Sequence, residues 1–596
     1  MEPSPPDSQE RLALEQAEQR LQQGDFAGAI RRLSEAVQRW PEQPELWGRL
    51  GRLLVQVGRH GEAIHCLQRA AELDPGDRAC RTELGHLFRN LGEVEAAIHW
   101  HGEALALQPD SLLLHLNHLF VLPVVADSAE QIAWCRRRCE QGLRELEQQG
   151  GLRFHPDTAA ACHPFYLLYQ EADDRELMER YGRLIVRALQ PDPPLPPEQA
   201  ALPAAGSAPG PGQRLRIGFL SGFFHEHSNA RAFEGLILHL DRQQFEVVLI
   251  HLASTPRDRV SERLESWCDQ VVVLPAPLQA ASEALAALGL QLLFFTDLGM
   301  HPFLTMLAAR RSAPVQATGW GVPQTSGLPT VDYYVSGELV EPEQAEHTYV
   351  ETLVRLPGLP CCYLSENLAA MAETAGAPAP LGLSRDYFLL PPDRPLWGIL
   401  HRFEKLTPEF DPVLEELARA VPESLFVMVE DKLPSLTARF LERLERTAPA
   451  TRERLLLLGR MQRSEFLSLG GCLDVLLDPF PFGSGITLYE TIHTGTPVVT
   501  LEGRFLRSRF VAGAYRLMGV EQAPVAHSPE QYAAVAVELM RDPERRGRLR
   551  AEIAAGARAH LYDRRDYVRG FERVARVAGA AGAAAAQARG LRAPAP

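Results

Sequence analysis

The stretch "DPFPFGSGITLYETIHTGTPVV", Asp478 to Val499, follows an apolar run and contains a turn rich in proline and glycine, a helical segment and a second apolar run. We predict that "DVLLDPF" (474–480) is a strand, that "TLYETIHTG" forms the first turns of a helix, and that "PVVTLEG" (497–503) is the next strand. Short apolar runs separated by spacers of helix length are typical of parallel strands that are buried on both faces. This stretch therefore predicts one unit of an α/β fold.

Apolar runs of this kind recur on both sides of a connection rich in Pro, Gly and Ala near residues 374–393. They lie at 215–222, 245–252, 291–299 and 332–337 before it, and at 396–403, 425–431, 455–460, 474–480 and 497–503 after it. We predict two doubly wound, Rossmann-like domains that cover residues 214–370 and 371–575. Ligands of such sheets bind beyond the carboxyl ends of the strands, so we expect a site in the cleft between the domains.

The N-terminal part of the chain contains an internal repeat with a period of 34 residues. Its repeated positions are Gly24, Gly58 and Gly92, then Ala29, Ala63 and Ala97, then Pro41, Pro75 and Pro109, with a further pair at Gly51 and Gly85. Glycine would turn the chain between two helices, alanine would let them approach closely, and proline would end the second helix. The pattern resembles the tetratricopeptide repeat and predicts a helical array over residues 10–190 with a concave binding face. The alternative is a set of unrelated amphipathic helices.

Two low-complexity segments complete the predicted organisation. The segment "PDPPLPPEQAALPAAGSAPGPGQ" has too few large apolar side chains to pack, so we predict a linker over residues 191–213. The Ala- and Gly-rich C-terminus, residues 576–596, predicts a disordered tail.

Composition limits the classes of function. The chain has 596 residues, of which 45% are hydrophobic and 23% charged, as is usual for water-soluble globular proteins. No apolar run approaches the roughly 20 residues that span a bilayer, and the N-terminus lacks the features of a secretory signal, so we expect a cytoplasmic protein without membrane insertion. The net charge of -15 argues against nucleic acid as a partner. The nine cysteines are scattered and lack metal-ligand spacing, so we expect neither a disulfide framework nor a metal site.

The turn within residues 478–499 is a candidate anion site, because the free amides at a helix N-terminus favour negative charge and glycines let a phosphate approach the backbone. Its predicted members are Gly483, Ser484 and Gly485 in the loop, and Ile486, Thr487 and Leu488 at the helix start. Glu490 follows one turn later, where a carboxylate would suit the hydroxyl groups of a ribose. The alternative is an ordinary tight turn with a helix cap and a solvated carboxylate.

Three further residues follow predicted strands of the second α/β domain. Lys405, in "HRFEKLTPEF", could neutralise a diphosphate leaving group, although a single lysine is more often solvated. Arg463 and Phe466, in "RMQRSEFLSL", offer a cation and a flat face on which a nucleobase could stack. Phe466 could equally be a core residue of an amphipathic helix.

The first α/β domain contributes two candidate loops. The turn after "RIGFLSG" carries His225 and His227 near a helix start, where a histidine could act as a general base on an acceptor hydroxyl. Most loop histidines have no such role. The glycine-rich segment "ATGWGVPQTSGLPTVDYYVS" (317–336) suggests a loop that lines the ligand. Its polar and aromatic members are Trp320, Gln324, Thr325 and Ser326.

These motifs together resemble the O-linked N-acetylglucosamine transferase/SPINDLY-type family. The segments that carry the resemblance are "RIGFLSGFFHEHS", "APVQATGWGVPQTSGLPTVDYYVS", "FEKLTPEFDP", "LLLLGRMQRSEFLSLGGCLDVLLDPFPFGSGITLYETIHTGTPVVTLEG" and "RFLRSRFVAGAYRLMGV". They occur in the family's order between residue 214 and about residue 540, and the repeats precede them as they do in that family. The resemblance implies a tetratricopeptide array joined to a GT-B catalytic region of two Rossmann-like domains.

The resemblance also implies roles for individual residues. Lys405 matches the family lysine that grips the diphosphate, and Ile486 and Thr487 match the helix-start positions that bind the phosphates. Glu490 stands where the family has an acidic residue for the ribose, Phe466 at a position used against the base, and Arg463 at a nearby basic position. His227 matches the histidine of a "DFGNH"-like turn near the acceptor. The animal-type "NGHTT" turn reads "SGITL" here, so the family histidine is absent from this turn.

The implied activity is inverting, metal-independent transfer of a sugar from a nucleotide diphosphate to Ser or Thr of a protein, without a cofactor. N-acetylglucosamine from UDP-N-acetylglucosamine is the expected donor, and protein acceptors would bind through the repeats. UDP-glucose and GDP-fucose stay open as donors, as does a small or lipid-linked acceptor. The alternative from another class is a non-catalytic scaffold, in which the repeats bind partners and the α/β region has lost turnover.

Overall fold

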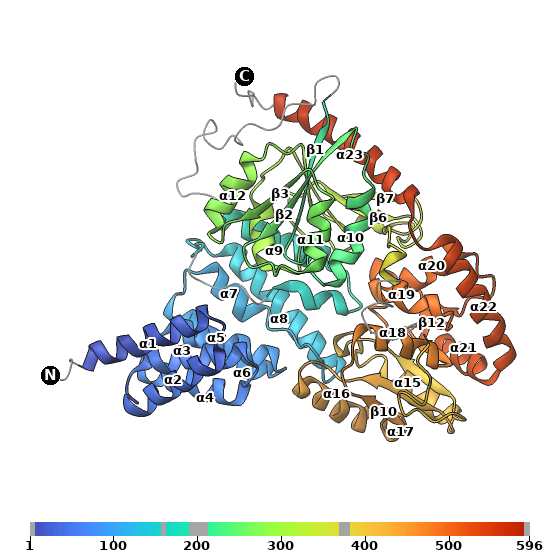
Figure 1. The fold of residues 1–596 in the computed structure, drawn as a ribbon, viewed down its shortest axis with the longest axis horizontal. Helices are drawn as coiled ribbons and strands as arrows, with labels where there is room; N and C mark the ends of the chain where they lie inside the picture. The colour runs from blue at the N-terminus through green and yellow to red at the C-terminus, as the bar shows by residue number, and fades with distance from the viewer. Residues whose placement is uncertain (1–5, 156–162, 190–212, 369–381, 589–596) are drawn as a thin grey trace. The chain divides into compact units, whose positions relative to one another are not determined.

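The computed structural model describes residues 6–155, 163–189, 213–368 and 382–588 (Figure 1). Nearly all of the predicted linker, residues 191–213, lies outside these ranges. The chain forms two compact units, one made of residues 1–124 with 149–163 and the other of residues 125–148 with 164–596. No helix within the described ranges is long and apolar enough to cross a membrane.

The first unit consists of consecutive helices joined by short turns. They are α1 (Pro6–Gln22), α2 (Phe26–Arg39), α3 (Pro44–Gln56), α4 (His60–Leu73), α5 (Arg78–Asn90), α6 (Val94–Leu107) and α7 (Leu112–Leu119). Gly24, Gly58 and Gly92 adopt φ angles of 76°, 76° and 84°, which only glycine adopts readily, so the predicted turns between helices are confirmed. The helices α2, α4 and α6 each end two residues before a repeat proline.

Small residues set the spacing of these helices. The repeat alanines Ala29, Ala63 and Ala97 are fully buried. A Cβ atom on Gly51 would lie 2.7 Å from Leu67 Cγ, and one on Gly85 would lie 2.6 Å from the ring of His101. A larger side chain at either glycine would therefore push α3 from α4 or α5 from α6, which explains why small residues recur at the period of the repeat.

The second unit contains two parallel sheets, as predicted. We call the part built on the first sheet the N-terminal lobe; its strands have the order β3-β2-β1-β4-β5-β6-β7. They are β1 (Leu215–Ser221), β2 (Phe245–Leu252), β3 (Gln270–Leu274), β4 (Leu292–Phe295), β5 (Val315–Gly319), β6 (Tyr333–Gly337) and β7 (Thr352–Leu356). The helices between them are α10 (Ser228–His239), α11 (Arg259–Ser266), α12 (Leu278–Ala287) and α13 (Pro302–Ala309).

The part built on the second sheet is the C-terminal lobe, with the strand order β10-β9-β8-β11-β12-β13. The strands are β8 (Leu396–Ile399), β9 (Leu425–Val429), β10 (Leu455–Leu458), β11 (Val475–Leu477), β12 (Val498–Leu501) and β13 (Val525–Ala526). The helices are α15 (Asp411–Ala420), α16 (Pro434–Thr447), α17 (Pro449–Glu453), α18 (Arg463–Cys472), α19 (Ile486–Thr491), α20 (Phe510–Met518), α21 (Pro529–Arg541) and α22 (Pro543–His560).

The sequence missed β3, β5, β7 and β13, and each omission has a local cause. β3 and β7 are the two edge strands of their sheet and are less buried than the central strands; Val273 of β3 is 53% exposed. β5 reads "VQATG", with one large apolar residue, and β13 has two residues. All paired strands run parallel. Their carboxyl ends therefore lie along one edge of each sheet, where ligands of such folds bind.

The boundary of the predicted helical array, residues 10–190, differs from the structure. The helices α8 (Ala129–Gln148), η1 (Pro164–Tyr169) and α9 (Arg175–Leu189) belong to the second unit. Buried charges anchor them there. Arg136 bonds to Asp174 at 2.6 Å, and Arg507 of the C-terminal lobe donates to the carbonyls of Gln170 and Ala172 at 2.7 Å. These contacts join residues far apart in the sequence, so the amphipathic pattern alone could not reveal them.

The predicted tail and the end of the predicted C-terminal domain also need correction. Helix α23 spans Arg565–Ala588, so part of the segment predicted as disordered is helical, while residues 589–596 lie outside the described ranges. Figure 1 shows α23 running along the N-terminal lobe, where it contacts β4, β5 and β7. Tyr567, Phe571, Ala575 and Ala578 are buried at helical spacing. Alanine is the best helix former, so a composition read as low complexity supports a packed helix here.

Phe571 anchors α23 on the first sheet, because its ring lies 5.5 Å from that of Phe294 and 6.1 Å from that of Phe219. We expect Phe571→Ala to lower the free energy of unfolding by about 3 to 5 kcal/mol, since it leaves a cavity between helix and sheet. Chemical denaturation followed by circular dichroism measures this change. Val577→Ala is the matched control, because Val577 lies on the same helix and is 71% exposed. Equal losses for the two variants would contradict the packing role.

Candidate functional site

A cavity of 570 Å³ lies at the carboxyl ends of both sheets. Residues that follow β1, β4 and β5 line it from the N-terminal lobe, and residues that follow β8, β9, β10 and β11 line it from the C-terminal lobe. Seven of the predicted site residues lie on its wall: His227, Trp320, Lys405, Phe466, Gly485, Ile486 and Thr487. The remaining predicted residues, Arg463, Gly483, Ser484, Glu490, Gln324, Thr325 and Ser326, are not among those that line it.

The turn between β11 and α19 is shaped by the buried carboxylate of Asp478. Asp478 accepts hydrogen bonds from the amide and hydroxyl of Ser484, at 2.7 and 2.8 Å, and from the hydroxyl of Thr500 at 2.8 Å. A Cβ atom on Gly483 would lie 2.5 Å from this carboxylate, so the glycine is required for the close approach. Burial raises the pKa of Asp478, while Ser484, Thr500 and the Lys405 ammonium favour its charged form. Gly483 and Ser484 thus hold the turn rather than line the cavity.

Helix α19 begins at Ile486, as predicted, with Gly485 at its N-cap. Within the described structure, the amides of Ile486 and Thr487 make no hydrogen bond, and both residues face the cavity. The amide of Leu488 was predicted to be free, but it donates to the carbonyl of Gly485 at 3.1 Å. Such a bond is usual in a first helical turn and leaves two free amides here rather than three.

Lys405 reaches the same turn from the loop after β8. Its Nζ donates to the carbonyl oxygen of Gly483 at 2.7 Å and lies 4.3 Å from the centre of the Phe482 ring. Burial lowers the pKa of the ammonium to about 8, against the opposing attraction of Asp478 and Glu404. Lys405, Ile486 and Thr487 line one cavity, and the anion site itself stays a prediction.

Arg463 and Glu490, whose contacts with the donor stay a prediction, belong to a hydrogen-bonded cluster of charged and polar side chains. The carboxylate of Glu490 is buried, and its Oε1 accepts from Arg231 Nε at 3.0 Å, from the Tyr363 hydroxyl at 3.3 Å and from Arg463. Arg231 also pairs with Glu226 at 2.6 Å. Because Arg231 and Glu226 come from the N-terminal lobe, this cluster joins the two lobes. Arg463 and Glu490 therefore contribute first to the connection between lobes.

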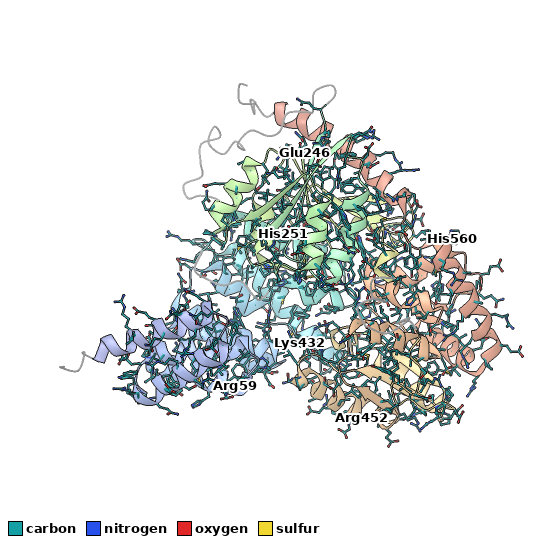
Figure 2. The ribbon with its side chains drawn as sticks, in the orientation of Figure 1. Arg59, Glu246, His251, Lys432, Arg452 and His560 are labelled. Carbon is teal, nitrogen blue, oxygen red and sulfur yellow. The ribbon has the colours of Figure 1, made fainter. Side chains whose placement is uncertain are left out.

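Phe466 is half-buried in the first turn of α18 and lines the cavity, so it is not a core residue. Further cations that line the same cavity were missed by the sequence analysis. Arg460 follows β10, and Lys432, which is labelled in Figure 2, follows β9. Both are exposed, and both lie at the carboxyl end of a strand, which is the signal that could have revealed them.

His227 is the N-cap of α10, and its Nδ1 accepts a hydrogen bond from the amide of Asn229 at 3.1 Å. A backbone amide can only donate, so Nδ1 is unprotonated and the neutral ring carries its proton on Nε2. The ring stacks on Phe223 at 4.5 Å, and burial, with the nearby His225, lowers the pKa of His227 to about 4. At neutral pH the free nitrogen of His227 is a hydrogen-bond donor. This geometry does not support the predicted role as a base.

The predicted sugar or acceptor loop divides into lining and supporting residues. Trp320 lines the cavity, and its Nε1 has no hydrogen-bond partner in the described part of the chain. Thr325 and Ser326 support the loop through the buried carboxylate of Glu351, to which the Thr325 hydroxyl donates at 2.6 Å and the Ser326 amide at 2.8 Å. Gln324 is 7% exposed, and neither its Nε2 nor its Oε1 has a partner there.

One wall of the cavity comes from outside the two predicted domains. The segment "PFYLLY", which forms η1, contributes Phe165, Tyr166, Leu168 and Tyr169. The sequence analysis assigned this segment to the helical array. Its aromatic richness is the only sequence signal, because the repeat has faded there. Across the described residues, no cluster of three or more His, Cys, Asp or Glu side chains is arranged to hold a metal ion.

Comparisons with known proteins agree with this architecture. The Tetratricopeptide repeat model matches residues 20–82, and the Glycosyl transferase family 41 model matches residues 202–360 and 363–571. Among solved structures, a variant of the O-GlcNAc transferase of Thermobaculum terrenum is similar in fold, with a TM-score of 0.69, 24% identity, and coverage of 98% of this chain and 100% of that chain.

Similar curated proteins include two described as "Probable UDP-N-acetylglucosamine--peptide N-acetylglucosaminyltransferase SPINDLY". The one from Solanum lycopersicum is 26% identical over 61% of this chain and 39% of its own length, and the one from Arabidopsis thaliana is 26% identical over 58% and 37%. The chain thus spans about two fifths of the length of these relatives. The family model covers more than half of the chain, including both lobes and the cavity between their strand ends. The protein therefore belongs to glycosyl transferase family 41.

Proposed function

We propose that this protein is a glycosyltransferase that moves a sugar from a nucleotide diphosphate to a hydroxyl group of Ser or Thr in protein acceptors. The observation that carries the proposal is that the Lys405 ammonium and the free amides of Ile486 and Thr487 line one cavity at the strand ends of a family 41 fold. A cation and a helix N-terminus that converge on one space suit a diphosphate.

The proposed reaction is a single displacement at the anomeric carbon, which inverts its configuration. The glycosidic C–O bond to the diphosphate breaks as the acceptor oxygen forms the new bond. Negative charge then develops on the diphosphate oxygen, where Lys405 and the two amides would stabilise it. These groups are preorganised by Asp478 and Gly483, so they cost little reorganisation in the transition state. The proposal assigns this charge stabilisation to protein groups, without a metal ion or other cofactor.

His227 would contribute as a hydrogen-bond donor in this reaction. Its Nε2–H can bond to an oxygen of the bound donor or acceptor, and its Nδ1 is occupied by the cap of α10. The proton of the acceptor hydroxyl must therefore go to another group, such as a diphosphate oxygen of the leaving group or water. Acceptor proteins would be selected in part by the tetratricopeptide repeats, which commonly bind extended peptides.

UDP-N-acetylglucosamine is the donor that the descriptions of the similar proteins favour. Phe466, Arg460 and Lys432 lie at the end of the cavity that the strands β9 and β10 supply, where a nucleobase could stack and accept hydrogen bonds. UDP-glucose and GDP-fucose are the alternative donors, and their binding can be compared with that of UDP-N-acetylglucosamine. A preferred donor stabilises the folded protein by mass action, so a thermal-shift series with each nucleotide sugar ranks them.

Trp320 supplies a second line of support for a polar ligand. A buried polar group without a partner costs roughly 1 to 3 kcal/mol, so unpaired groups beside a cavity are expected where a ligand completes their bonds. Trp320 Nε1 is such a group. We assign Trp320, which lines the cavity, to contact with the bound sugar or acceptor. Gln324 is buried in the same loop without lining the cavity, so we assign it to the packing of that loop.

Replacing Lys405 tests the proposed function directly. We expect Lys405→Met to lower kcat/KM for sugar transfer by about a hundredfold to a thousandfold, because one preorganised charge contact to the leaving group is lost. Release of the nucleoside diphosphate and labelling of an acceptor protein measure transfer. Lys432→Met is the control, since Lys432 is exposed at the cavity wall, and its loss should stay below about tenfold. Full transfer by folded Lys405→Met protein would refute the proposal.

The pH dependence of transfer follows from the same lysine. The charged form of Lys405 is present below its pKa of about 8 and is lost above it, so activity should fall as pH rises through 8. Lys405→Arg should move this alkaline limb upward, because a guanidinium stays protonated. Transfer rates between pH 6 and pH 10, with a check that the fold persists, provide the measurement. A wild-type profile that stays flat to pH 10 would show that Lys405 does not act as the cation.

Gln324 allows stability and activity to be separated. Because its amide is buried without a partner, Gln324→Met should raise the free energy of unfolding of the free protein by about 1 kcal/mol. The same change should leave transfer largely unchanged, because Gln324 does not line the cavity. Thermal unfolding and donor kinetics test both effects. Thr325→Val is the comparison, because it removes a satisfied bond to Glu351 and should lower stability. A destabilised Gln324→Met variant would contradict the assignment.

A further inference from the structure

The Lys405 ammonium is held by the face of an aromatic ring as well as by a carbonyl. Its Nζ lies 4.3 Å from the centre of the Phe482 ring and 2.7 Å from the oxygen of Gly483, the next residue. Phe482 is 8% exposed and lines the cavity. A cation over an aromatic face is attracted more strongly where it is partly removed from water, and Lys405 is half-buried at the cavity wall.

Other neighbouring side chains hold the Phe482 ring in place. The ring of Tyr169 lies 4.9 Å from it, with 37° between the two planes. Leu168 and Val322 pack with Phe482 in one small apolar cluster, which Phe165, Tyr169 and Met300 complete. The cluster therefore combines η1, the loops after β4 and β5, and the turn after β11. These contacts leave the ring little freedom to turn away from Lys405.

We infer that Phe482 is a positioning residue for Lys405, and that Tyr169 of η1 holds Phe482 in place. The ring face keeps the ammonium at the turn where the diphosphate of the proposed donor would bind. Segment 164–169, which lies outside both sheets, thereby completes the anion site of the C-terminal lobe. This inference rests on the proposed function for the identity of the ligand.

A simple packing role for Phe482 makes a different prediction. Leucine is apolar and can fill much of the same space, so it would preserve packing, whereas it has no aromatic face for the ammonium. Tyrosine keeps the face. A difference in nucleotide affinity between the leucine and tyrosine variants, seen only when Lys405 is present, would therefore report the contact between ring and cation.

The test measures binding of UDP and of GDP by calorimetry in wild type, Phe482→Leu, Phe482→Tyr, Lys405→Met and the double variant Phe482→Leu/Lys405→Met. We expect Phe482→Leu to weaken binding of the preferred nucleotide about tenfold and Phe482→Tyr to retain most of the affinity. In the Lys405→Met background, Phe482→Leu should cause little further loss of affinity, because the two residues act as a unit. Equal losses for leucine and tyrosine, or a full leucine effect without Lys405, would overturn the inference.

Tyr169 provides a second variant that leaves Phe482 in place, should Phe482→Leu fail to fold. Tyr169→Leu should weaken nucleotide binding in the same direction, and Tyr169→Phe should retain it. An unchanged affinity in folded Tyr169→Leu protein would overturn the role of η1. Sugar transfer is measured separately. Nucleotide binding that depends on Phe482 and Lys405 without transfer to any acceptor would refute the proposed function while it supports the inference.

Discussion

The buried carboxylate of Asp478 is the constraint on which the proposed anion site depends. It accepts two bonds from Ser484 and one from Thr500, and it lies near the Lys405 ammonium. A carboxylate in this position is costly unless its oxygens are satisfied, so the turn must fold around it in one conformation. That conformation brings the carbonyl of Gly483 to Lys405 and starts α19 at Ile486, which lines the cavity with Thr487.

The cavity also depends on how the lobes are joined. Glu490 receives bonds from Arg231, Arg463 and Tyr363, which come from both lobes and their connection. Loss of one member would leave buried charge without a partner, so the cluster strongly favours a single arrangement of the strand ends. The aromatic residues of η1 close a further wall, held by Arg507 through the carbonyls of Gln170 and Ala172. The site is thus made from three separate parts of the chain.

Much of the site was predictable because its signals are local. Strand, turn and helix around residues 478–499 follow from apolar runs, glycines and a helix start, and Lys405 follows a predicted strand. The roles of Glu490, Arg463 and His227 were not predictable in this way. Each depends on a partner far along the chain or on which ring nitrogen caps a helix, namely Arg231, Tyr363 and the amide of Asn229. Only its exposure in the structure shows that Phe466 is not a core residue.

The sequence by itself determined the tetratricopeptide repeats, the two parallel α/β lobes and the glycine-rich turn between strand and helix at residues 478–499, because period, strand pattern and turn composition are properties of neighbouring residues. Only the tertiary structure decided that η1 joins the active cavity, that α23 returns to the N-terminal lobe, and that Phe482 faces the Lys405 ammonium. Those features arise from packing and charge pairing between segments that are distant in the chain, and such contacts leave no fixed spacing in the sequence.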